Sequence, residues 1–580
     1  MMAMPGHSYH RSSEPALLRN GREANEVSEL TPALIASGIA HQKGGRLAHA
    51  EHCYLAALRL DPGNSEATYL MGVLGLQSGN GDGALAYFAR AIAERQGDAD
   101  ALCNMGTANV LGGHFDEAQK WLLQALAVDP GHITTRLGIA NLCRLLGRVA
   151  EWTEHYRIAL RSPLLSPAMY SKVLVALHSS PLISLEELYG LHREWERRYA
   201  AAMYGRWREH ANERSAERKL RVGFVSSSFH ATIVGHFFRG VLRSLRSRSD
   251  IATFLYSSGT ESDWLSAELK ELSGRWRDVA ALDDDAAAAC VRTDGVDVLI
   301  DLDGHAPGSR LLVFARKPAP IQISWFDYFD TTGLEAIDYL ITDPVSTPPD
   351  GGQRFVERLL FMPTMRLCFT APPFAPDVAP LPALTTKRIT FGCFTRADKI
   401  GPNVLAVWAR ILVAVPDSRL VLKSATFKFP ELRRRFECAF ADRGIHPARL
   451  ELRTASTYEQ LLAEYSGVDI ALDPFPYNGG ATTCDALWMG VPVVARRGDS
   501  LISRQSAAML EAAGLSNLIG RDDDAYVQIA ANLASDAARL GALRNDLRPT
   551  ISTSPLFDAD AFADALVARL RLVWCEWCGA

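Results

Sequence analysis

The chain of 580 residues lacks any apolar run near the roughly 18 residues that a membrane-spanning helix needs. It also lacks an excess of basic charge, since 61 Lys and Arg stand against 66 Asp and Glu. Its first 20 residues have no apolar core of the signal-peptide kind, and their polarity predicts a disordered tail over residues 1–28. We therefore expect a cytoplasmic protein that binds neither a membrane nor a nucleic acid.

Paired cysteines are scarce. The ten cysteines are scattered and mostly lie in apolar contexts, as Cys103, Cys143 and Cys290 do, which favours reduced core residues. The one close pair, Cys575 and Cys578, has no second pair with which to form a zinc site. This pair therefore indicates no chemistry.

A repeat with a period of 34 residues occupies residues 29–165. The recurring positions are Ala57, Ala91, Ala125 and Ala159; Gly45, Gly79, Gly113 and Gly147; and Tyr54, Phe88, Leu122 and Tyr156. The period is typical of tetratricopeptide repeats, each a pair of helices. Four repeats begin near Thr31, Ser65, Ala99 and Ile133. Their concave surface usually binds a peptide or a partner protein, and the alternative is a scaffold that packs on the next domain or forms a homodimer.

Two α/β domains follow a helical connector that we predict over residues 166–217. In residues 218–380 the predicted strands include 219–226, 251–256 and 296–302, and in residues 381–580 they include 388–394, 419–423, 450–452 and 468–472. Strands that alternate with helices predict a parallel sheet in each domain, with ligands bound beyond the carboxyl ends of the strands. The fold class is thus α/β with an all-α N-terminal part.

One turn in the second domain has the form of a phosphate site. The chain passes through Asn478, Gly479 and Gly480 into a predicted helix, residues 482–489. Glycines let a ligand approach the backbone, and a helix start offers free N–H groups and a positive dipole end. Asp485, predicted in the first turn of the helix, would bind a sugar diol. The alternative is an ordinary helix cap by one of two adjacent threonines, with Asp485 favouring the dipole.

His305 follows the strand 296–302, where a ligand of a parallel sheet would lie, and both a pocket role and a structural role remain open for it. Asp301 and Asp303 have the spacing of an Asp-x-Asp metal motif. Because Asp301 lies within the strand, we favour a structural role for this pair.

Residues 473–480 and 482–492 resemble the nucleotide-sugar loop of the O-linked N-acetylglucosamine transferase and SPINDLY-like family. Residues 310–322, 331–333, 338–343 and 391–394 are also similar to stretches of that family. The resemblance covers most of residues 219–515, with the repeats upstream in the expected order. It implies a tetratricopeptide-repeat solenoid followed by a pair of Rossmann-like domains. This pair is the GT-B fold.

The resemblance implies an inverting, metal-independent transferase that moves N-acetylglucosamine from UDP-N-acetylglucosamine to Ser or Thr of a protein acceptor on the repeats, with no cofactor. Lys399 matches the lysine that neutralises the donor diphosphate. Ser456 lies on a loop that either meets the nucleotide base or is a plain loop. The expected donor-binding residues are Lys399, Ser456, Asn478, Gly479, Gly480, Ala481, Thr482, Thr483 and Asp485.

Two departures from the family pattern leave the catalytic base open. Thr232 stands where the family has a cleft histidine, so His230 or His236 replaces it or the role is absent. Residues 328–333 replace the family's Gly-Tyr-Pro-Gly and bring in Asp330. The candidates are His230, His236, His305 and Asp330, with a solvent relay as the alternative.

Two other functions remain open. GDP-fucose is an alternative donor, since SPINDLY-like members use it and Gly480 and Ala481 lack the side chains of animal members. A catalytically inactive interaction module is the second alternative, suggested by Thr232.

Overall fold

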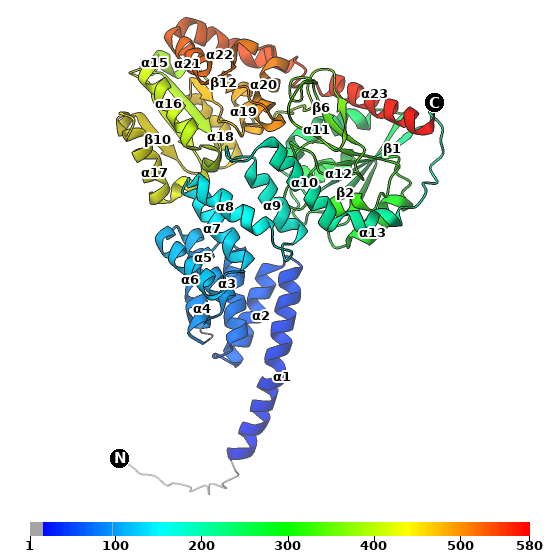
Figure 1. Cartoon of the computed structure of the whole chain (residues 1–580), viewed down its shortest axis with the longest axis vertical. Coiled ribbons are helices and arrows are strands. Elements are labelled where there is room, and N and C mark those ends of the chain that lie inside the picture. The colour runs from blue at the N-terminus through cyan, green and yellow to red at the C-terminus, as the bar shows by residue number, and fades with distance from the viewer. Residues whose placement is uncertain (1–15, 95–96, 580) are drawn as a thin grey trace, which may run out of the picture. The chain divides into compact units, whose positions relative to one another are not determined.

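The computed structural model describes residues 16–94 and 97–579, and the structural statements below concern these residues. The chain forms two compact units, Met1–Leu142 and Cys143–Ala580, which we call the repeat unit and the α/β unit. Figure 1 labels their helices and strands in chain order. None of the described helices combines the length and the hydropathy that crossing a bilayer requires.

The repeat unit consists of paired helices. They are α1 (Ala16–Lys43), α2 (Leu47–Leu60), α3 (Ser65–Gln77), α4 (Gly81–Glu94), α5 (Ala99–Gly112), α6 (Phe115–Val128) and the first part of α7 (Ile133–Leu145). The tail predicted over residues 1–28 is wrong from Ala16 onward, because α1 begins there. Ala, Leu, Arg and Glu in this stretch are strong helix formers, a signal that its polar composition had obscured. Residues 1–15 of that prediction lie outside the described part of the chain.

The 34-residue period follows from contacts between the two helices of each repeat. A Cβ atom on Gly72 would lie 2.7 Å from the Phe88 ring, so the small residue lets the helices approach closely. Gly79, in the turn between these helices, has φ +73°, a left-handed conformation that glycine adopts without strain. Small and large residues therefore recur together along this part of the sequence.

The α/β unit begins with helices α8 (Val149–Leu160), α9 (Pro167–Leu177) and α10 (Leu185–Tyr199) and the 3-10 helix η1 (Ala201–Arg206). The connector predicted to be helical over residues 166–217 is so only up to Arg206. The charged stretch from Arg208 to Lys219 has no apolar stripe with which a helix could pack.

The first sheet has seven parallel strands in the order β3-β2-β1-β4-β5-β6-β7. They are β1 (Leu220–Ser226), β2 (Ile251–Ser257), β3 (Arg275–Asp278), β4 (Val298–Asp301), β5 (Ile321–Ser324), β6 (Tyr339–Thr342) and β7 (Arg358–Phe361). The helices between them are α11 (Ile233–Arg246), α12 (Trp264–Leu272), α13 (Asp284–Thr293) and α14 (Leu311–Ala315). All seven residues of β1 except Arg221 are buried, as expected of a strand covered on both faces.

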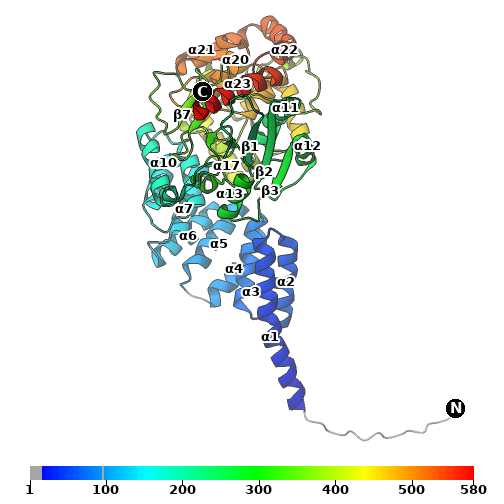
Figure 2. The ribbon, with the colours of Figure 1, turned by 90° about the vertical axis from the view of Figure 1, so that its right-hand side faces the viewer.

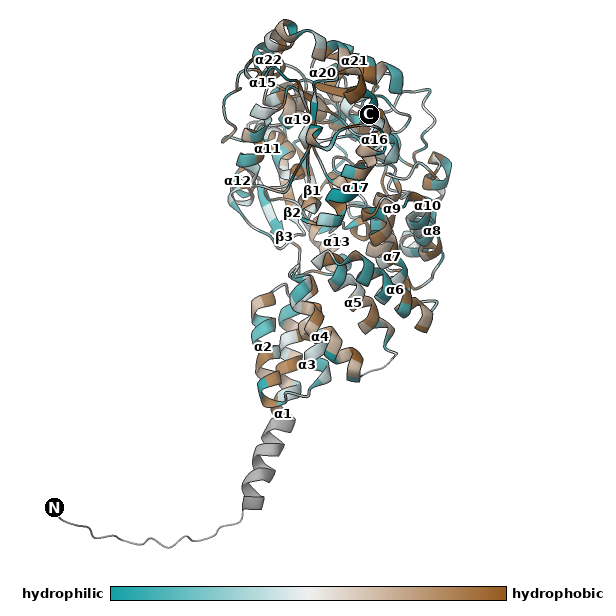
Figure 3. Ribbon diagram, turned by 90° about the vertical axis from the view of Figure 1, so that its left-hand side faces the viewer, coloured by the Kyte–Doolittle hydropathy of each residue, from teal (hydrophilic) through white to brown (hydrophobic). Residues whose placement is uncertain are grey.

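The second sheet has six parallel strands in the order β10-β9-β8-β11-β12-β13. They are β8 (Thr390–Phe394), β9 (Arg419–Lys423), β10 (Leu450–Arg453), β11 (Ile470–Leu472), β12 (Val493–Arg496) and β13 (Ile519–Gly520). The α-helices of this part are α15 (Pro382–Thr386), α16 (Pro402–Ala414), α17 (Pro430–Ala441), α18 (Tyr458–Glu464), α19 (Ala481–Trp488), α20 (Leu501–Ala512), α21 (Asp523–Ser535) and α22 (Ala537–Ser552). Short 3-10 helices are η2 (Ala397–Lys399), η3 (Ala425–Lys428), η4 (Pro447–Arg449), η5 (Tyr465–Gly467) and η6 (Ser516–Leu518). Helices of both units mix hydrophilic and hydrophobic residues, as helices that bury one face do (Figure 3).

The last helix, α23 (Ala559–Cys578), returns from the second sheet to the first and lies beside α11 (Figure 2). The Phe562 ring stacks on Trp325 with ring centroids 5.7 Å apart, and Trp574 Nε1 donates to the Ser215 carbonyl at 3.0 Å. One continuous core cluster includes residues of both sheets and of this helix. The two sheets are thus held together as one body.

Candidate active site

A cavity of about 750 Å³ lies where strands of both sheets end. Its lining comes from the loops that follow β4, β5, β8, β9, β10 and β11. These are the carboxyl ends of parallel strands, where open α/β sheets bind their ligands. Representative lining residues are Ala306, Asp327, Lys399, Ser424, Ser456 and Thr482.

The glycine turn after β11 is fixed by hydrogen bonds within the second sheet's domain. The Gly479 N–H donates to Asp473 Oδ1 at 2.7 Å, and the Gly479 carbonyl accepts from Gln505 Nε2 at 3.0 Å and Ser506 Oγ at 3.2 Å. A Cβ atom on Gly479 would lie 2.5 Å from Thr483 Oγ1. The turn therefore requires a glycine at this position.

Helix α19 begins at Ala481 with Gly480 as its N-cap, and no side chain caps it. The alternative interpretation, a cap by Thr482 or Thr483, is therefore wrong. The hydroxyl of Thr483 is buried and lies 3.1 Å from Ser506 Oγ, so it supports the turn instead. Gly480, Ala481 and Thr482 line the cavity, which places the uncapped N-terminus of α19 at its wall. Such an end attracts an anion through its N–H groups and the helix dipole.

Lys399 comes from the loop after β8 and meets this turn. Its Nζ donates to the Asn478 carbonyl at 2.9 Å and lies 4.1 Å from the centroid of the Tyr477 ring. Burial lowers the pKa of Lys399 and Arg396 adds to that effect, whereas Asp473 opposes it. The fold thus brings a cation and the N-terminus of α19 to one cavity wall.

Two other predicted donor residues, Ser456 and Asn478, occupy different environments. Ser456 lines the cavity and is partly exposed. Asn478 is buried, and its Nδ2 donates to the Pro474 carbonyl at 3.0 Å, so its side chain shapes the turn.

Asp485 does not lie in the first turn of α19, contrary to the prediction, because the helix begins one residue earlier than predicted. Its side chain is buried and accepts a hydrogen bond from the Tyr458 hydroxyl at 2.7 Å. Burial raises the pKa of Asp485 to about 7. Asp485 is absent from the described lining of the cavity.

The three histidine candidates for the base all lie outside the described lining of the cavity. His230 Nδ1 lies 3.4 Å from Glu261. His236 is buried in α11 beside the Tyr458 ring, and burial lowers its pKa to about 4. Both nitrogens of His305 have partners: Nδ1 lies 2.8 Å from Ser171 Oγ and Nε2 lies 2.9 Å from the Thr332 carbonyl.

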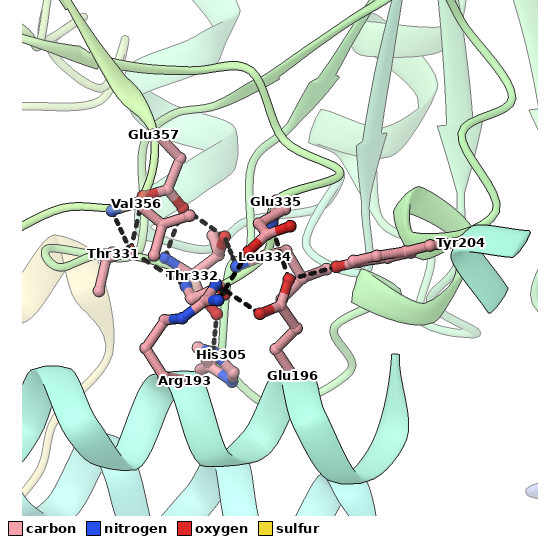
Figure 4. Close-up of polar contacts among 11 residues, drawn as sticks. Arg193, Glu196, Tyr204, His305, Thr331, Thr332, Leu334, Glu335, Val356 and Glu357 are labelled. Carbon is pink, nitrogen blue, oxygen red and sulfur yellow. Dashed lines mark hydrogen bonds and ion pairs between the residues drawn. The ribbon is translucent and has the colours of Figure 1, made fainter. Parts of the chain in front are cut away.

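Figure 4 shows the polar contacts that hold the loop after β5 near His305. The buried carboxylate of Glu357 accepts from the Thr331 hydroxyl at 2.6 Å and from the Thr332 N–H at 2.7 Å. The Glu335 N–H donates to Glu196 of α10 at 2.7 Å. The loop is therefore bonded to Glu357, which directly precedes β7, to α10 and to His305.

Asp330 belongs to a buried group that we call the histidine cluster: His178, His192, Tyr328 and Asp330. The Tyr328 oxygen lies 2.5 Å from His192 Nε2 and 3.4 Å from His178 Nε2, and Asp330 Oδ2 lies 3.6 Å from His178 Nε2. His192 Nδ1 lies 2.6 Å from the Leu188 carbonyl, which makes Nδ1 the protonated nitrogen and leaves Nε2 to accept. Burial raises the pKa of Asp330 to about 7 and lowers that of His192 to about 4.

His178, His192 and Asp330 are also the residues whose donor atoms could together hold a metal ion, since these atoms lie within 4.8 Å of one another. The Tyr328 hydroxyl already occupies the lone pair of His192 Nε2, so hydrogen bonding accounts for the arrangement. His178, His192 and Asp330 are absent from the described lining of the 750 Å³ cavity.

Thr232, at the family's histidine position, is the N-cap of α11. Its Oγ1 donates to the Ser228 carbonyl at 2.9 Å and accepts from the Gly235 N–H at 3.4 Å. The residue therefore has a structural role here.

Sequence reasoning missed Asp327. Among the described lining residues the carboxylates are Asp327 and Asp398, and Asp398 forms an ion pair with Arg144. Burial raises the pKa of Asp327 to about 7, and Asp303 adds to the rise. The signal was present in the departure at residues 328–333, because matching Tyr328 to the tyrosine of Gly-Tyr-Pro-Gly puts Asp327 at the family's first glycine.

Two parallel sheets that share a cavity at their carboxyl ends, with a lysine beside a helix N-terminus, have the architecture of the GT-B class. Residues 202–369 and 381–566 match glycosyl transferase family 41, and residues 35–99 and 75–134 match tetratricopeptide repeats. The chain therefore belongs to glycosyl transferase family 41.

Similar proteins include probable UDP-N-acetylglucosamine–peptide N-acetylglucosaminyltransferases named SPINDLY. The Petunia hybrida protein is 37% identical over 399 residues, which are 68% of this chain and 42% of that protein. The Arabidopsis thaliana protein named SEC is 28% identical over 62% of this chain and 38% of its own length. The matched segments thus span less than half of these relatives.

A solved structure, a mutant of the O-GlcNAc transferase from Thermobaculum terrenum, is similar over most of both chains. It is 33% identical with a TM-score of 0.77, and the match covers 95% of this chain and 99% of that one.

Proposed function

We propose that the protein is a protein O-glycosyltransferase that moves N-acetylglucosamine from UDP-N-acetylglucosamine to a Ser or Thr hydroxyl, with inversion and without a metal ion. The observation that carries this proposal is the position of Lys399, whose Nζ bonds the Asn478 carbonyl beside the uncapped N-terminus of α19. Names of relatives in family 41 support the same donor and acceptor class.

The two groups at this wall suit the departure of a diphosphate. When an acceptor hydroxyl attacks the anomeric carbon, the bond to the phosphate oxygen breaks and negative charge grows on the leaving group. The ammonium of Lys399 and the N–H groups that begin α19 are positioned in advance to stabilise that charge. This is the task that a metal ion performs in other transferases, so the proposal needs none.

The acceptor and the donor sugar are the finer parts of the proposal. A protein acceptor would lie on the concave surface of the tetratricopeptide repeats, and the alternative role of the repeats is to form a homodimer. GDP-fucose is the second candidate donor, because the chain is more similar to relatives named SPINDLY, at 35–37% identity, than to SEC at 28%. Gly480 and Ala481 line the cavity wall with no side chain larger than a methyl group.

The test is release of nucleoside diphosphate from a panel of nucleotide sugars in the presence of EDTA. We expect release from UDP-N-acetylglucosamine and inversion at the anomeric carbon of the product. Release from GDP-fucose alone would replace the donor and keep the transferase. Tight binding of UDP or GDP without release from any donor would identify an inactive interaction module and refute the proposal.

A further inference from the structure

We propose that Asp327 is the catalytic base that accepts the proton of the acceptor hydroxyl. This inference rests on the proposed glycosyl transfer and deepens it by naming the base. Another base is needed because the four candidates taken from the sequence all lie outside the described lining of the cavity.

Three hydrogen bonds hold the backbone at Asp327 and its two neighbours. The Asp327 N–H donates to the Leu302 carbonyl at 3.0 Å. The carbonyls of its two neighbours, Phe326 and Tyr328, both accept from Nη2 of the buried Arg366, at 3.0 and 3.1 Å. A group held in this way is already in place when a substrate arrives, which is what a catalytic group needs.

The backbone directly before Asp327 is strained. Phe326 has φ +91°, a conformation that side-chain-bearing residues rarely adopt. Strained residues of this kind persist where the surrounding structure enforces them and cluster at active sites. Here the hydrogen bonds of Arg366 enforce the conformation, and the strained residue directly precedes Asp327.

The carboxylate of Asp327 is available to bind a proton. No residue in the described part of the chain donates a hydrogen bond to the Asp327 side chain or forms an ion pair with it. Asp398, the other carboxylate in the described lining, is engaged by Arg144. Asp327 is half-buried and lines the same cavity as Lys399, so an acceptor hydroxyl between them would face a base on one side and the departing diphosphate on the other.

The surroundings of Asp327 also suit its pKa to a base. Burial raises the pKa of Asp327 to about 7 and Asp303 adds to the rise, whereas Arg366, Arg396 and Lys399 lower it. A base works best when its pKa lies near the working pH, because it is then both deprotonated and able to hold a proton. Turnover should accordingly fall about tenfold per pH unit below pH 7, as the carboxylate takes up a proton.

The oxygen of the Ser or Thr hydroxyl forms a bond to the anomeric carbon, and its proton passes to a carboxylate oxygen of Asp327. The bond between that carbon and the phosphate oxygen breaks, and the nucleoside diphosphate leaves with the bonding electrons beside Lys399. Proton release from Asp327 to water restores the base.

The test uses the full chain and the donor that the panel identifies, with water as the acceptor. We expect Asp327→Asn to lower turnover at least 100-fold while the Kd of the nucleoside diphosphate changes less than threefold. Asp330→Asn is the matched control, because it changes a buried carboxyl three residues away on the same loop, and its turnover should stay within threefold.

Azide separates the chemical role of Asp327 from a structural one. This anion attacks the anomeric carbon without losing a proton, so it needs no base. Sodium azide should raise nucleoside diphosphate release by Asp327→Ala at least tenfold and yield a glycosyl azide. It should not do so for Lys399→Ala, which lacks stabilisation of the leaving group.

Three results would overturn the inference: turnover within threefold of wild type in Asp327→Asn, loss of donor affinity equal to the loss of turnover, or no response of Asp327→Ala to azide. A wild type that releases nothing from any donor would refute the proposed function itself, and Asp327 with it.

Discussion

Asp327 and Asp330 lie on one loop, and burial raises the pKa of both to about 7, yet the structure gives them different surroundings. Asp327 lines the cavity with a carboxylate that no described residue bonds. Asp330 lies in the histidine cluster, 3.6 Å from His178, and its Oδ1 accepts from the Thr331 N–H at 2.7 Å. Burial thus shifts the pKa of both carboxyls in the same direction, whereas Asp327 lines the cavity and Asp330 is absent from its described lining.

This difference teaches that a shifted pKa indicates function only together with a cavity. In the histidine cluster the polar groups satisfy one another, and Tyr328 bonds His192 there while its carbonyl bonds Arg366. At the cavity Lys399 and Asp327 both line the wall, and no described residue bonds the Asp327 carboxylate. Perturbed acidity occurs in structural networks as well as in active sites, and access separates the two.

The largest expected effect comes from removing the cation of the cavity. Lys399→Ala should lower turnover about 100- to 1000-fold, because one positioned charge on a developing anion contributes about 3–4 kcal/mol. The measurement is nucleoside diphosphate release at saturating donor. Lys428→Ala is the control, since this lysine is exposed and lies in the same domain. Equal turnover of the two variants would exclude Lys399 from leaving-group stabilisation.

A smaller effect should appear when the histidine cluster is broken. Burial lowers the pKa of His192 to about 4, so the folded imidazole stays neutral while the unfolded one takes up a proton below about pH 6.5. Wild type therefore loses stability through His192 as pH falls, by about 1.4 kcal/mol per unit. His192→Gln removes this loss, so its deficit in free energy of unfolding should be about 2 kcal/mol smaller at pH 5 than at pH 7.5.

Urea unfolding at the two pH values measures this difference. His446→Gln, a change at an exposed histidine of the second domain, is the control. A deficit of His192→Gln that is the same at both pH values would mean that the folded cluster binds the proton. The cluster would then resemble an accessible site, and the contrast with the cavity would fail.

The sequence predicted those features that depend on a contiguous stretch. The repeats were visible because each glycine, such as Gly72, meets a large side chain at a constant distance along the chain. The turn at Gly479 was visible because glycines before a helix are the pattern expected of a phosphate site made of backbone groups. Lys399 was found through its matching flanks, and the structure adds its hydrogen bond to Asn478.

The remainder depends on contacts between distant segments. The start of α19 at Ala481, one residue earlier than predicted, turns Asp485 toward Tyr458. Likewise, Asp330 could not be separated from Asp327 by sequence, because the histidines of its cluster come from the end of α9, at His178, and from α10. Arg366, which fixes the neighbours of Asp327, lies 39 residues away in the sequence.

The smallest expected effect tests whether the cavity wall depends on backbone geometry. In Gly479→Ala the new Cβ would meet Thr483 Oγ1 at 2.5 Å and Asp473 Oδ1 at 2.8 Å, so the turn must shift. The N–H groups of α19 would move with it, and we expect the Kd of the nucleoside diphosphate to rise about tenfold, or about 1.4 kcal/mol.

The control for this change is Gly467→Ala, where a Cβ would meet nothing within 4 Å. Calorimetric titration of both variants gives the Kd. The backbone N–H groups do not titrate, so the tenfold difference should be the same at pH 6 and pH 8, unlike the effect of Asp327→Asn on turnover. A difference that vanished at one pH would mean that a titrating side chain, such as Asp473 beside the turn, controls binding at this wall.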